Sequence, residues 1–394
     1  MQILYLSVLA SSKTLEEARQ RNPQLSGYSM QKFSRLVVEG LTRNGQQVTA
    51  LSTFYQSSYG LFWSHRGEKE GGVTYKYIVS PNYEPLRHLW LTIYCFFYIL
   101  KWGLFNKKDK VLVCDVLRVS ACMGAVVAAR LIGLRRVGIM TDMPGLMVSR
   151  SKKSTKRNYI SMNTQINKSF LVHFTHYVFL TEKMNEAINV NRRPYIVMEG
   201  LVDADMPVPN ADMKENKRIV LYAGGLHERY GLKMLVEGFI AANVENAELW
   251  LYGDGPFADE LPEYMQRDSR IHYFGIRPNY EIVEAEHHAT LLVNPRPTHE
   301  EFTLYSFPSK NMEYMVSGTP VLTTKLPGMP TEYYPYVYLF DQGETTEGYA
   351  SVLHKVLSLP ASELQTKGEN AYKWVLDHKN HIKQTKRIMQ LVNG

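Results

Sequence analysis

The feature that most limits the fold is the alternation of short apolar runs with segments whose apolar residues recur at helical spacing. Residues 29–44 have this helical spacing, and Gly45 follows as a helix stop. The runs predicted as strands in the first half are residues 3–9, 48–52, 110–114, 137–140 and 177–180. Strands that are apolar throughout and alternate with helices are typical of a parallel sheet covered on both faces. The first half is therefore predicted to be a doubly wound α/β domain.

A second series of the same kind begins after residues 203–217, a segment with two prolines and mixed charges. Its predicted strands are residues 219–222, 247–252, 271–274, 290–294 and 320–323, and its predicted helices are residues 232–242, 280–287, 310–316 and 349–358. The chain of 394 residues has room for two domains of this size. We predict Rossmann-like domains at 1–203 and 204–377 that face a cleft. A C-terminal helix within 371–392 is expected to cross back, so that about 378–394 joins the first domain.

The two halves differ in charge. Residues 1–200 hold 27 Lys and Arg against 12 Asp and Glu, whereas the remaining residues hold 18 against 26. A basic domain joined to an acidic one suggests that the first domain faces an anionic partner. Nucleic acid, an anionic membrane leaflet and a phosphate-bearing acceptor are the candidates. No nucleic-acid-binding module is recognisable, so we expect no nucleic acid.

Cysteine usage and hydropathy indicate a cytoplasmic chain. The three cysteines form no C-x-x-C pair, and an odd number cannot close a disulfide framework. Residues 1–9 lack the basic region of a signal peptide and are expected to form a buried strand. The longest apolar run, residues 89–100, is far shorter than the roughly 20 residues of a membrane-spanning helix.

A glycine turn follows the first strand of the second half. Residues 222–226 read Tyr-Ala-Gly-Gly-Leu, and Arg229 and Lys233 come shortly after. Glycines such as Gly225 let the backbone approach a phosphate, and the next helix points N–H groups at it. The alternative is an ordinary strand-to-helix turn with surface cations, which short glycine motifs alone do not exclude.

Residues 306–321 form the segment with the densest chemistry. Pro308 suits the first turn of a helix, which places the N–H groups of Ser309 and Lys310 at a positive helix end beside the Lys310 ammonium. This arrangement predicts a diphosphate site. Glu313, one turn further on, is able to accept hydrogen bonds from the vicinal hydroxyls of a ribose. The alternative is a solvated helix in which Lys310 and Glu313 are only neighbours.

The order of these motifs resembles the C-terminal domain of retaining glycosyltransferases of family 4, which have the GT-B fold. The motifs in chain order are Tyr-Ala-Gly-Gly-Leu at 222–226, Tyr-Gly-Leu at 230–232, Leu-Tyr-Gly-Asp-Gly at 251–255, Phe-Gly at 274–275, Asn-Pro at 294–295 and Phe-Pro-Ser-Lys-x-x-Glu-Tyr-Met-x-x-Gly-Thr-Pro-Val at 307–321. The closest resemblance is to bacterial enzymes of capsule, exopolysaccharide and O-antigen assembly. Shorter matches in the first half lie at 141–145, 180–181 and 199–203.

The resemblance implies roles for residues of the second domain. The donor nucleotide diphosphate is expected there, with Glu313 as the second glutamate of the family's Glu-x7-Glu motif and Arg229 near a family cation. The family's first glutamate falls at Tyr305 in this sequence. Tyr305, or Glu301 from a shifted loop, is therefore expected to hold the transferred sugar.

The resemblance places the acceptor and part of the sugar site on the first domain. Asp142 lies where many relatives have a His or Asp facing the reacting sugar, and a loop hydrogen bond is the alternative role. Asp115 is a second candidate. Gly27, in the first loop, would allow close approach of the donor.

Two further segments suggest a membrane surface. Residues 86–105 include the aromatic residues Trp90, Tyr94, Phe97, Tyr98 and Trp102, flanked by Arg87 and Lys101, and residues 150–157 (RSKKSTKR) form a basic cluster. Aromatic and basic residues together suit a bilayer interface. A buried core helix and a solvated loop are the alternative.

The prediction for the whole chain is an enzyme, a hexosyltransferase-like glycosyltransferase with catalytic Asp142, Arg229 and Lys310. It would move a sugar from a nucleoside diphosphate sugar to a glycan or polyprenyl-diphosphate-linked acceptor in cell-surface polysaccharide synthesis. The resemblance implies retention. The sequence has no Asp-x-Asp motif at the end of a predicted strand and no His/Cys cluster with metal-ligand spacing, so no metal or other cofactor is expected. The chain is expected in the cytoplasm, with contact to the inner face of the cell membrane. The alternatives are a nucleotide-sugar epimerase and a non-catalytic glycolipid- or partner-binding protein.

Overall fold

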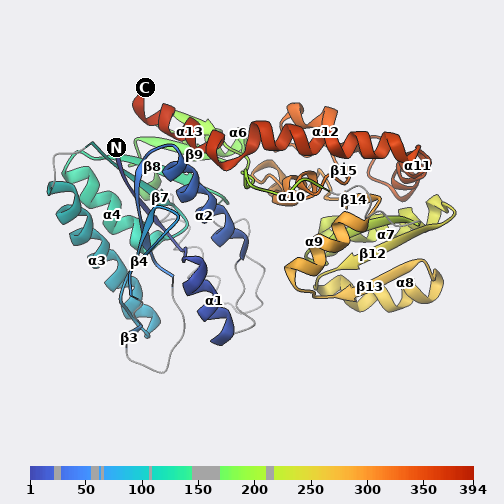
Figure 1. The fold of residues 1–394 in the computed structure, drawn as a ribbon, viewed down its shortest axis with the longest axis horizontal. Helices are drawn as coiled ribbons and strands as arrows, with labels where there is room; N and C mark the ends of the chain where they lie inside the picture. Colours follow the sequence, from blue (N-terminus) through green and yellow to red (C-terminus); the bar gives the residue numbers. More distant parts are fainter. Residues whose placement is uncertain (22–27, 55–61, 64–65, 106–108, 144–168, 210–216) are drawn as a thin grey trace. The chain divides into compact units, whose positions relative to one another are not determined.

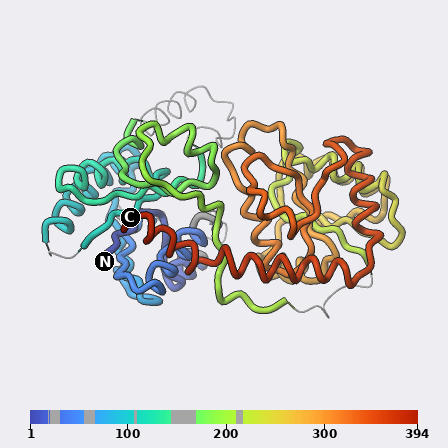
Figure 2. The backbone as a smooth tube through the Cα atoms, turned by 90° about the horizontal axis from the view of Figure 1, so that it is seen from above, coloured from blue at the N-terminus to red at the C-terminus, as the bar shows by residue number. Residues whose placement is uncertain are grey.

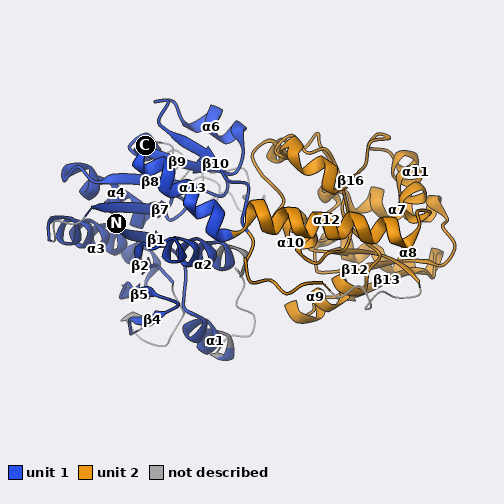
Figure 3. Cartoon of the chain, turned by 45° about the horizontal axis from the view of Figure 1, so that its top comes forward, with its two compact units in different colours: residues 1–201, 381–394 blue, residues 202–380 orange. Residues whose placement is uncertain are grey.

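The computed structural model describes residues 1–394 except 22–27, 55–61, 64–65, 106–108, 144–168 and 210–216. Contacts divide the chain into two compact units (Figure 3). Unit 1 comprises residues 1–201 and 381–394, and unit 2 comprises residues 202–380. Each unit has its own mostly parallel sheet with helices, which confirms the predicted fold class of two Rossmann-like α/β domains.

Unit 1 is built on an eight-stranded sheet (Figure 1). In sheet order its strands are β10 (Tyr195–Val197), β9 (His176–Phe179), β8 (Arg135–Met140), β7 (Lys110–Asp115), β1 (Gln2–Ser7), β2 (Gln47–Ser52), β5 (Val73–Tyr77) and β4 (Glu68–Glu70). All neighbours are parallel except β4 and β5, which form a hairpin. The chain runs outward from β1 in one direction and from β7 in the other, so the switch point of the topology lies between β1 and β7.

Helices cover both faces of this sheet. The helices of unit 1 are α1 (Ser12–Arg21), α2 (Tyr28–Arg43), α3 (Glu84–Leu104), α4 (Val119–Leu131), α6 (Glu182–Ile188) and α13 (His381–Asn393). Two short strands, β3 (Phe62–Trp63) and β6 (Ser80–Pro81), pair separately. Helix α3 packs on α4 where Gly124 lies against the backbone of Thr92, so a side chain at Gly124 would collide with α3.

The C-terminal helix α13 belongs to unit 1, as predicted. It packs on α2, where the Asn44 side chain donates to the Ile382 carbonyl (2.8 Å). Arg135 links both chain ends, because its guanidinium donates to the Val392 carbonyl (2.9 Å) and to the Met1 sulfur (3.9 Å). Figure 2 shows the two termini close together within this unit.

The sequence predicted one helix within 371–392, and this was wrong: the structure has α12 (Ala361–Lys379) and α13, separated at Asn380. Asn380 has an extended backbone, with φ −69° and ψ 154°. The end of α12 is satisfied from outside the helix, since the Val202 N–H donates to the Lys379 carbonyl (3.0 Å) and the Asn380 side chain donates to the Leu376 carbonyl (2.6 Å). The chain passes from unit 2 back to unit 1 at this break.

Unit 2 is built on a six-stranded parallel sheet. In sheet order its strands are β13 (Ile271–Gly275), β12 (Ala247–Tyr252), β11 (Arg218–Ala223), β14 (Leu291–Asn294), β15 (Val321–Thr323) and β16 (Tyr338–Leu339). The chain moves outward from β11 through β12 to β13 and then returns to β14 on the other side of β11. The switch point therefore lies between β11 and β14, where ligands of open α/β sheets bind.

Two apolar cores lie on the two faces of this sheet, because alternate residues of each strand point to opposite faces. One core contains Val220 and Tyr222 with side chains of α7, α8 and α11, and the other contains Ile219 and Leu221 with side chains of α9, α10 and α12. The remaining bounds are α7 (Leu232–Ala242), α8 (Leu261–Arg267), α9 (Asn279–His288), α10 (Ser309–Val316), α11 (Thr346–Leu357), η2 (Glu228–Tyr230), η3 (Pro256–Glu260), η4 (Glu301–Leu304) and η5 (Thr331–Tyr336).

Candidate functional site

The turn after β11 brings the backbone against Lys310. A β-carbon built on Gly224 would lie 2.5 Å from Lys310 Cε and 3.0 Å from Lys310 Nζ. At Gly225 the nearest atoms would be those of His227 (3.2 Å) and Tyr230 (3.4 Å). The Lys310 side chain therefore crosses the turn at Gly224, the neighbour of the Gly225 that the sequence singled out.

The turn after β12 fits against the same place. Gly253 has φ 121°, a backbone conformation that L side chains rarely adopt, and a β-carbon there would collide with the Gly224 carbonyl. The Gly224 N–H donates to the Tyr252 carbonyl (2.9 Å), and the Leu226 N–H donates to the Asp254 carbonyl (2.8 Å). The two glycine turns thus form one continuous backbone surface at the carboxyl ends of β11 and β12.

Helix α10 begins at this edge of the sheet. Pro308 precedes the helix as its N-cap residue, one position earlier than predicted, and Ser309 and Lys310 form the first turn. The first N–H groups of a helix have no acceptor within it and carry partial positive charge. Ser309 is exposed and Lys310 is half-buried, so an anion is able to reach both backbone N–H groups and the ammonium.

Three buried polar side chains fix the start of α10. The Asn294 amide donates to Asn311 Oδ1 (2.7 Å), and the Asn311 amide donates to Thr323 Oγ1 (3.3 Å). Thr323 Oγ1 in turn donates to the Asn294 carbonyl (3.1 Å). This network ties the helix to the ends of β14 and β15, and a fully satisfied buried network holds one geometry.

The pKa of Lys310 depends on its burial and on the charged groups around it. Burial lowers the pKa of the Lys310 ammonium, while the negative charges of Glu313 and Glu286 raise it and the positive charge of Arg296 lowers it further. A bound anion would restore the electrostatic stabilisation that the ammonium loses by leaving water. Glu313 is half-buried on the same helix, one turn beyond Lys310.

Two arginines lie over one pair of aromatic rings. The Arg229 guanidinium is 5.2 Å from the centre of the Tyr230 ring and 5.1 Å from that of Phe302. For Arg296 these distances are 5.0 and 5.7 Å, and the two rings meet edge to face at 6.0 Å. Rings under a guanidinium hold it in place without neutralising its charge.

The sequence analysis missed Arg296, although one signal for it was available. Arg296 comes directly after Asn294 and Pro295, at the carboxyl end of a buried central strand. A cation at that position faces the ligand-binding edge of a doubly wound sheet. Its stacking on Tyr230 depends on Gly231, because Gly231 packs against the Pro295 carbonyl and brings the two loops together.

The residues predicted to hold the transferred sugar lie on the loop before α10. Tyr305 is half-buried and ends η4, and its N–H donates to the Phe302 carbonyl (3.1 Å). Glu301 is exposed at the start of η4. Glu344 positions the loop by accepting hydrogen bonds from the Thr298 N–H (2.7 Å) and from His299 Nδ1 (3.2 Å).

In unit 1 the two predicted aspartates, Asp142 and Asp115, have different surroundings. Asp142 is half-buried and follows the carboxyl end of β8. Asp115 is buried and accepts hydrogen bonds from Ser7 Oγ (3.1 Å) and the Leu117 N–H (3.1 Å), and its Oδ2 also pairs with Arg118 (3.3 Å). Burial raises the pKa of Asp115, and Arg118 opposes this shift. Asp115 therefore has a structural role at the start of α4. Gly27 and the basic cluster at 150–157 lie outside the described residues.

Helix α3 exposes an apolar face. The large side chains exposed on it include Leu86, Leu89, Trp90, Ile93, Phe97 (64%) and Leu104 (68%). These positions recur at helical spacing, so they share one side of the helix. The interpretation of residues 86–105 as a fully buried core helix was thus wrong, although Cys95 and Ile99 on the other side are buried. In the part of the chain that the structure describes, no helix is long and apolar enough to cross a membrane.

No metal site is apparent in the described ranges, where no three His, Cys, Asp or Glu side chains are grouped to hold an ion. The independence from metal that the sequence predicted stays a prediction.

Comparison with known proteins identifies part of the chain directly. Residues 217–358 match the family model described as "Glycosyl transferases group 1". The matched range includes the glycine turns, both arginines and α10. No curated protein matches the chain by sequence.

Solved structures with the same fold match along the whole chain. Sucrose-phosphate synthase from Thermosynechococcus elongatus has a TM-score of 0.67 at 14% identity, covering 100% of this chain and 98% of that one. A glycosyltransferase from Rickettsia africae has a TM-score of 0.66 at 13% identity, covering 100% and 98%. Anabaena HepE in complex with UDP has a TM-score of 0.64 at 14% identity, covering 100% of both chains. At these identities the likeness establishes the two-domain GT-B fold.

Proposed function

We propose that this chain is a retaining glycosyltransferase that transfers a sugar from a nucleoside diphosphate sugar to a hydroxyl group. The acceptor would be a glycan or a lipid-linked oligosaccharide in cell-surface polysaccharide synthesis. The observation that carries the proposal is the Lys310 ammonium, which lies against Gly224 at the beginning of α10. The matching family domain at 217–358 supports the reaction class, and HepE, a solved structure of this fold, binds UDP and UDP-glucose.

In this proposal the diphosphate lies at the switch point of unit 2. The Ser309 and Lys310 N–H groups donate to its oxygens, and the Lys310, Arg229 and Arg296 cations neutralise its charge. As the bond between the anomeric carbon and the diphosphate oxygen breaks, negative charge grows on the leaving group, where these fixed cations stabilise it. Glu313 accepts the ribose hydroxyls.

The remaining roles follow from the resemblance. Tyr305 or Glu301 holds the transferred sugar, and Asp142 of unit 1 faces its anomeric carbon, where a carboxylate stabilises developing positive charge. The Gly27 loop admits the donor. The acceptor oxygen forms the new bond to the anomeric carbon with unchanged configuration, and its hydroxyl proton passes to the departing diphosphate.

A thermal-shift screen of UDP, GDP, dTDP and their sugars tests the donor class, since a ligand that binds only the folded chain raises its melting temperature. We expect one nucleotide series to stabilise the wild type and to have a much smaller effect on Glu313→Ala. The proposal fails if none of them shifts the transition. Release of free nucleoside diphosphate without an acceptor would favour the epimerase alternative, and binding without turnover would favour a non-catalytic protein.

We also propose that α3 rests on the membrane that carries the acceptor. Its exposed apolar side chains have the amphipathic character of interfacial helices, and the surplus of basic residues in 1–200 favours anionic lipid. Flotation with phosphatidylglycerol vesicles should recover the wild type and lose Phe97→Glu. Val190→Glu is the control, because Val190, which follows the C-terminal end of α6, is an equally exposed apolar side chain. Equal flotation of all three proteins would disprove the contact.

A further inference from the structure

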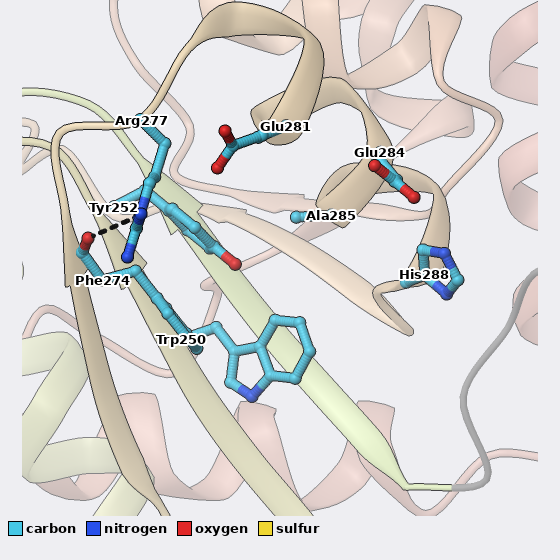
Figure 4. A pocket seen from close by; sticks show the side chains of 8 residues that line it. All are labelled: Trp250, Tyr252, Phe274, Arg277, Glu281, Glu284, Ala285 and His288. Carbon is cyan, nitrogen blue, oxygen red and sulfur yellow. Dashed lines mark hydrogen bonds between the residues drawn. The ribbon is translucent and has the colours of Figure 1, made fainter.

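A cavity of about 300 Å³ opens in unit 2 between α9 and the strands β12 and β13 (Figure 4). We call it the α9 groove and define it by Trp250, Tyr252 and Phe274 on the sheet and Glu281, Glu284 and His288 on the helix. None of these residues belongs to the site around Lys310. The volume is that of a small-molecule site.

The floor of the α9 groove is an aromatic platform. The Tyr252 and Phe274 rings stack with centres 4.7 Å apart and planes 12° apart, and Trp250 meets Phe274 edge to face at 5.4 Å. Trp250 Nε1 donates to Glu248 (3.0 Å), which is itself held by Lys217. The indole is thus fixed, and its hydrogen-bonding group is already used. What it offers to the groove is an apolar ring surface.

The opposite wall is one side of α9. Glu281, Glu284, Ala285 and His288 recur at the spacing that puts side chains on one side of a helix, and Figure 4 shows them above the aromatic floor. Ala285 is buried, Glu281 and His288 are half-buried, and Glu284 is exposed. Because Ala285 is small, the space between it and the aromatic floor stays open, with the two carboxylates along its rim.

The wall chemistry selects the ligand. Ionised Glu281 and Glu284 only accept hydrogen bonds, so the ligand has to donate, and a phosphate would be repelled. Arg277 at one end supplies N–H donors, with its Nε donating to the Phe274 carbonyl (3.0 Å), so the ligand also has to accept. Arg277 balances the charge of one of the two carboxylates. A pyranose satisfies all of these conditions, since its hydroxyls both donate and accept and one of its faces is apolar.

We propose that the α9 groove binds a neutral sugar residue of a glycan, stacked on Trp250 and hydrogen-bonded by Glu281 and Glu284. This goes beyond the proposed transferase function and does not depend on it, because none of the groove residues has a role in donor binding. Such a subsite would hold a glycan to unit 2 independently of the nucleotide.

An array of neutral oligosaccharides built from glucose, galactose, mannose and N-acetylglucosamine tests the proposal with the full-length chain. We expect the wild type to bind at least one of them, and titration calorimetry with that oligosaccharide should show roughly tenfold weaker binding for Trp250→Ala. Glu284→Gln, which keeps the shape of the side chain, should weaken binding without altering the fold. The control is Met265→Ala, at an exposed apolar side chain of α8 that does not line the groove.

Three results would overturn the proposal. Failure of every oligosaccharide to bind is the first. Displacement of the bound oligosaccharide by UDP, GDP or dTDP would make the groove part of the nucleotide site. Spermidine binding that Trp250→Ala and Glu284→Gln abolish, in the absence of sugar binding, would identify a cation site. Lys310→Met should leave oligosaccharide binding unchanged, so failure of the donor site and failure of this site are distinguishable.

Discussion

The two units have the same kind of sheet but treat their switch points in opposite ways. In unit 1, Ser7 at the end of β1 and Asp115 at the end of β7 bond directly to each other, which closes the gap between the strands. In unit 2, β11 ends in glycines and β14 leads to Arg296, and the half-buried Lys310 lies over the turn. One switch point pairs its own polar groups with each other, whereas the other brings Lys310 and Arg296 together beside a glycine turn. The fold provides the place, and the side chains decide whether a ligand is needed there.

The largest expected effect is on nucleoside diphosphate affinity, when the ammonium of Lys310 is removed from unit 2. Lys310→Met keeps the length of the side chain and removes the ammonium, so nucleoside diphosphate affinity should fall roughly a hundredfold, the value of a charge-assisted hydrogen bond in a dry site. Titration calorimetry measures this loss. Lys355→Met, at an exposed lysine of α11, is the control and should bind normally.

A somewhat smaller loss is expected for Arg296. Arg296→Ala should weaken nucleoside diphosphate binding about tenfold. Arg296→Lys should recover only part of it, because an ammonium lacks the planar, delocalised guanidinium that lies over the Tyr230 and Phe302 rings. Full recovery by lysine would show that the charge alone matters and that the aromatic support is irrelevant.

Gly224→Ala separates ligand binding from stability. The added methyl group would meet the flexible end of Lys310, so the ammonium should move while the fold persists. We expect about tenfold weaker nucleotide binding with a melting temperature close to that of the wild type. Gly225→Ala, where the nearest atoms are more distant, should have less effect on binding. If the two alanine variants bind equally, Lys310 does not occupy the described position.

The smallest effect tests the closed switch point of unit 1. Burial raises the pKa of Asp115 in the folded chain. The contribution of Asp115 to the free energy of unfolding is therefore present at low pH, and it is lost as the pH rises through the raised pKa. Asp115→Asn removes this dependence, so its free energy of unfolding at pH 7 should be no lower than that of the wild type, and nucleotide binding should be unchanged. Denaturant titrations at pH 4 and pH 7 measure it. A clear loss of stability at pH 7 would show that the Arg118 pair outweighs burial.

Much of the fold was predictable because its signals are local. A strand covered on both faces is apolar along its length, which is why β1, β7 and β11 stand out in the sequence. The hairpin of β4 and β5 was missed even though Gly71 and Gly72 join two runs of alternating residues, because charged residues in β4 hide the strand pattern. The break at Asn380 was not predictable, since it depends on Val202, a residue distant in the sequence.

The candidate site also has a part that was predictable from the sequence and a part that was not. Ser309, Lys310 and Glu313 lie within one turn or two of a single helix, so spacing alone relates them. The contact between Lys310 and Gly224, rather than Gly225, depends on how two loops from different parts of the chain meet. This contact cannot be read from the sequence. Arg296 acquires its setting from Tyr230 and Phe302 only in the folded unit, so an inspection of motifs passes over it.

The most direct test of the central claim is calorimetric titration of UDP, GDP and dTDP into the wild type, Lys310→Met and Asp115→Asn. At least one nucleotide should bind the wild type and Asp115→Asn with the same affinity, and its binding to Lys310→Met should be lost or weakened roughly a hundredfold. If that nucleotide binds Lys310→Met as tightly as the wild type, the beginning of α10 is not the diphosphate site.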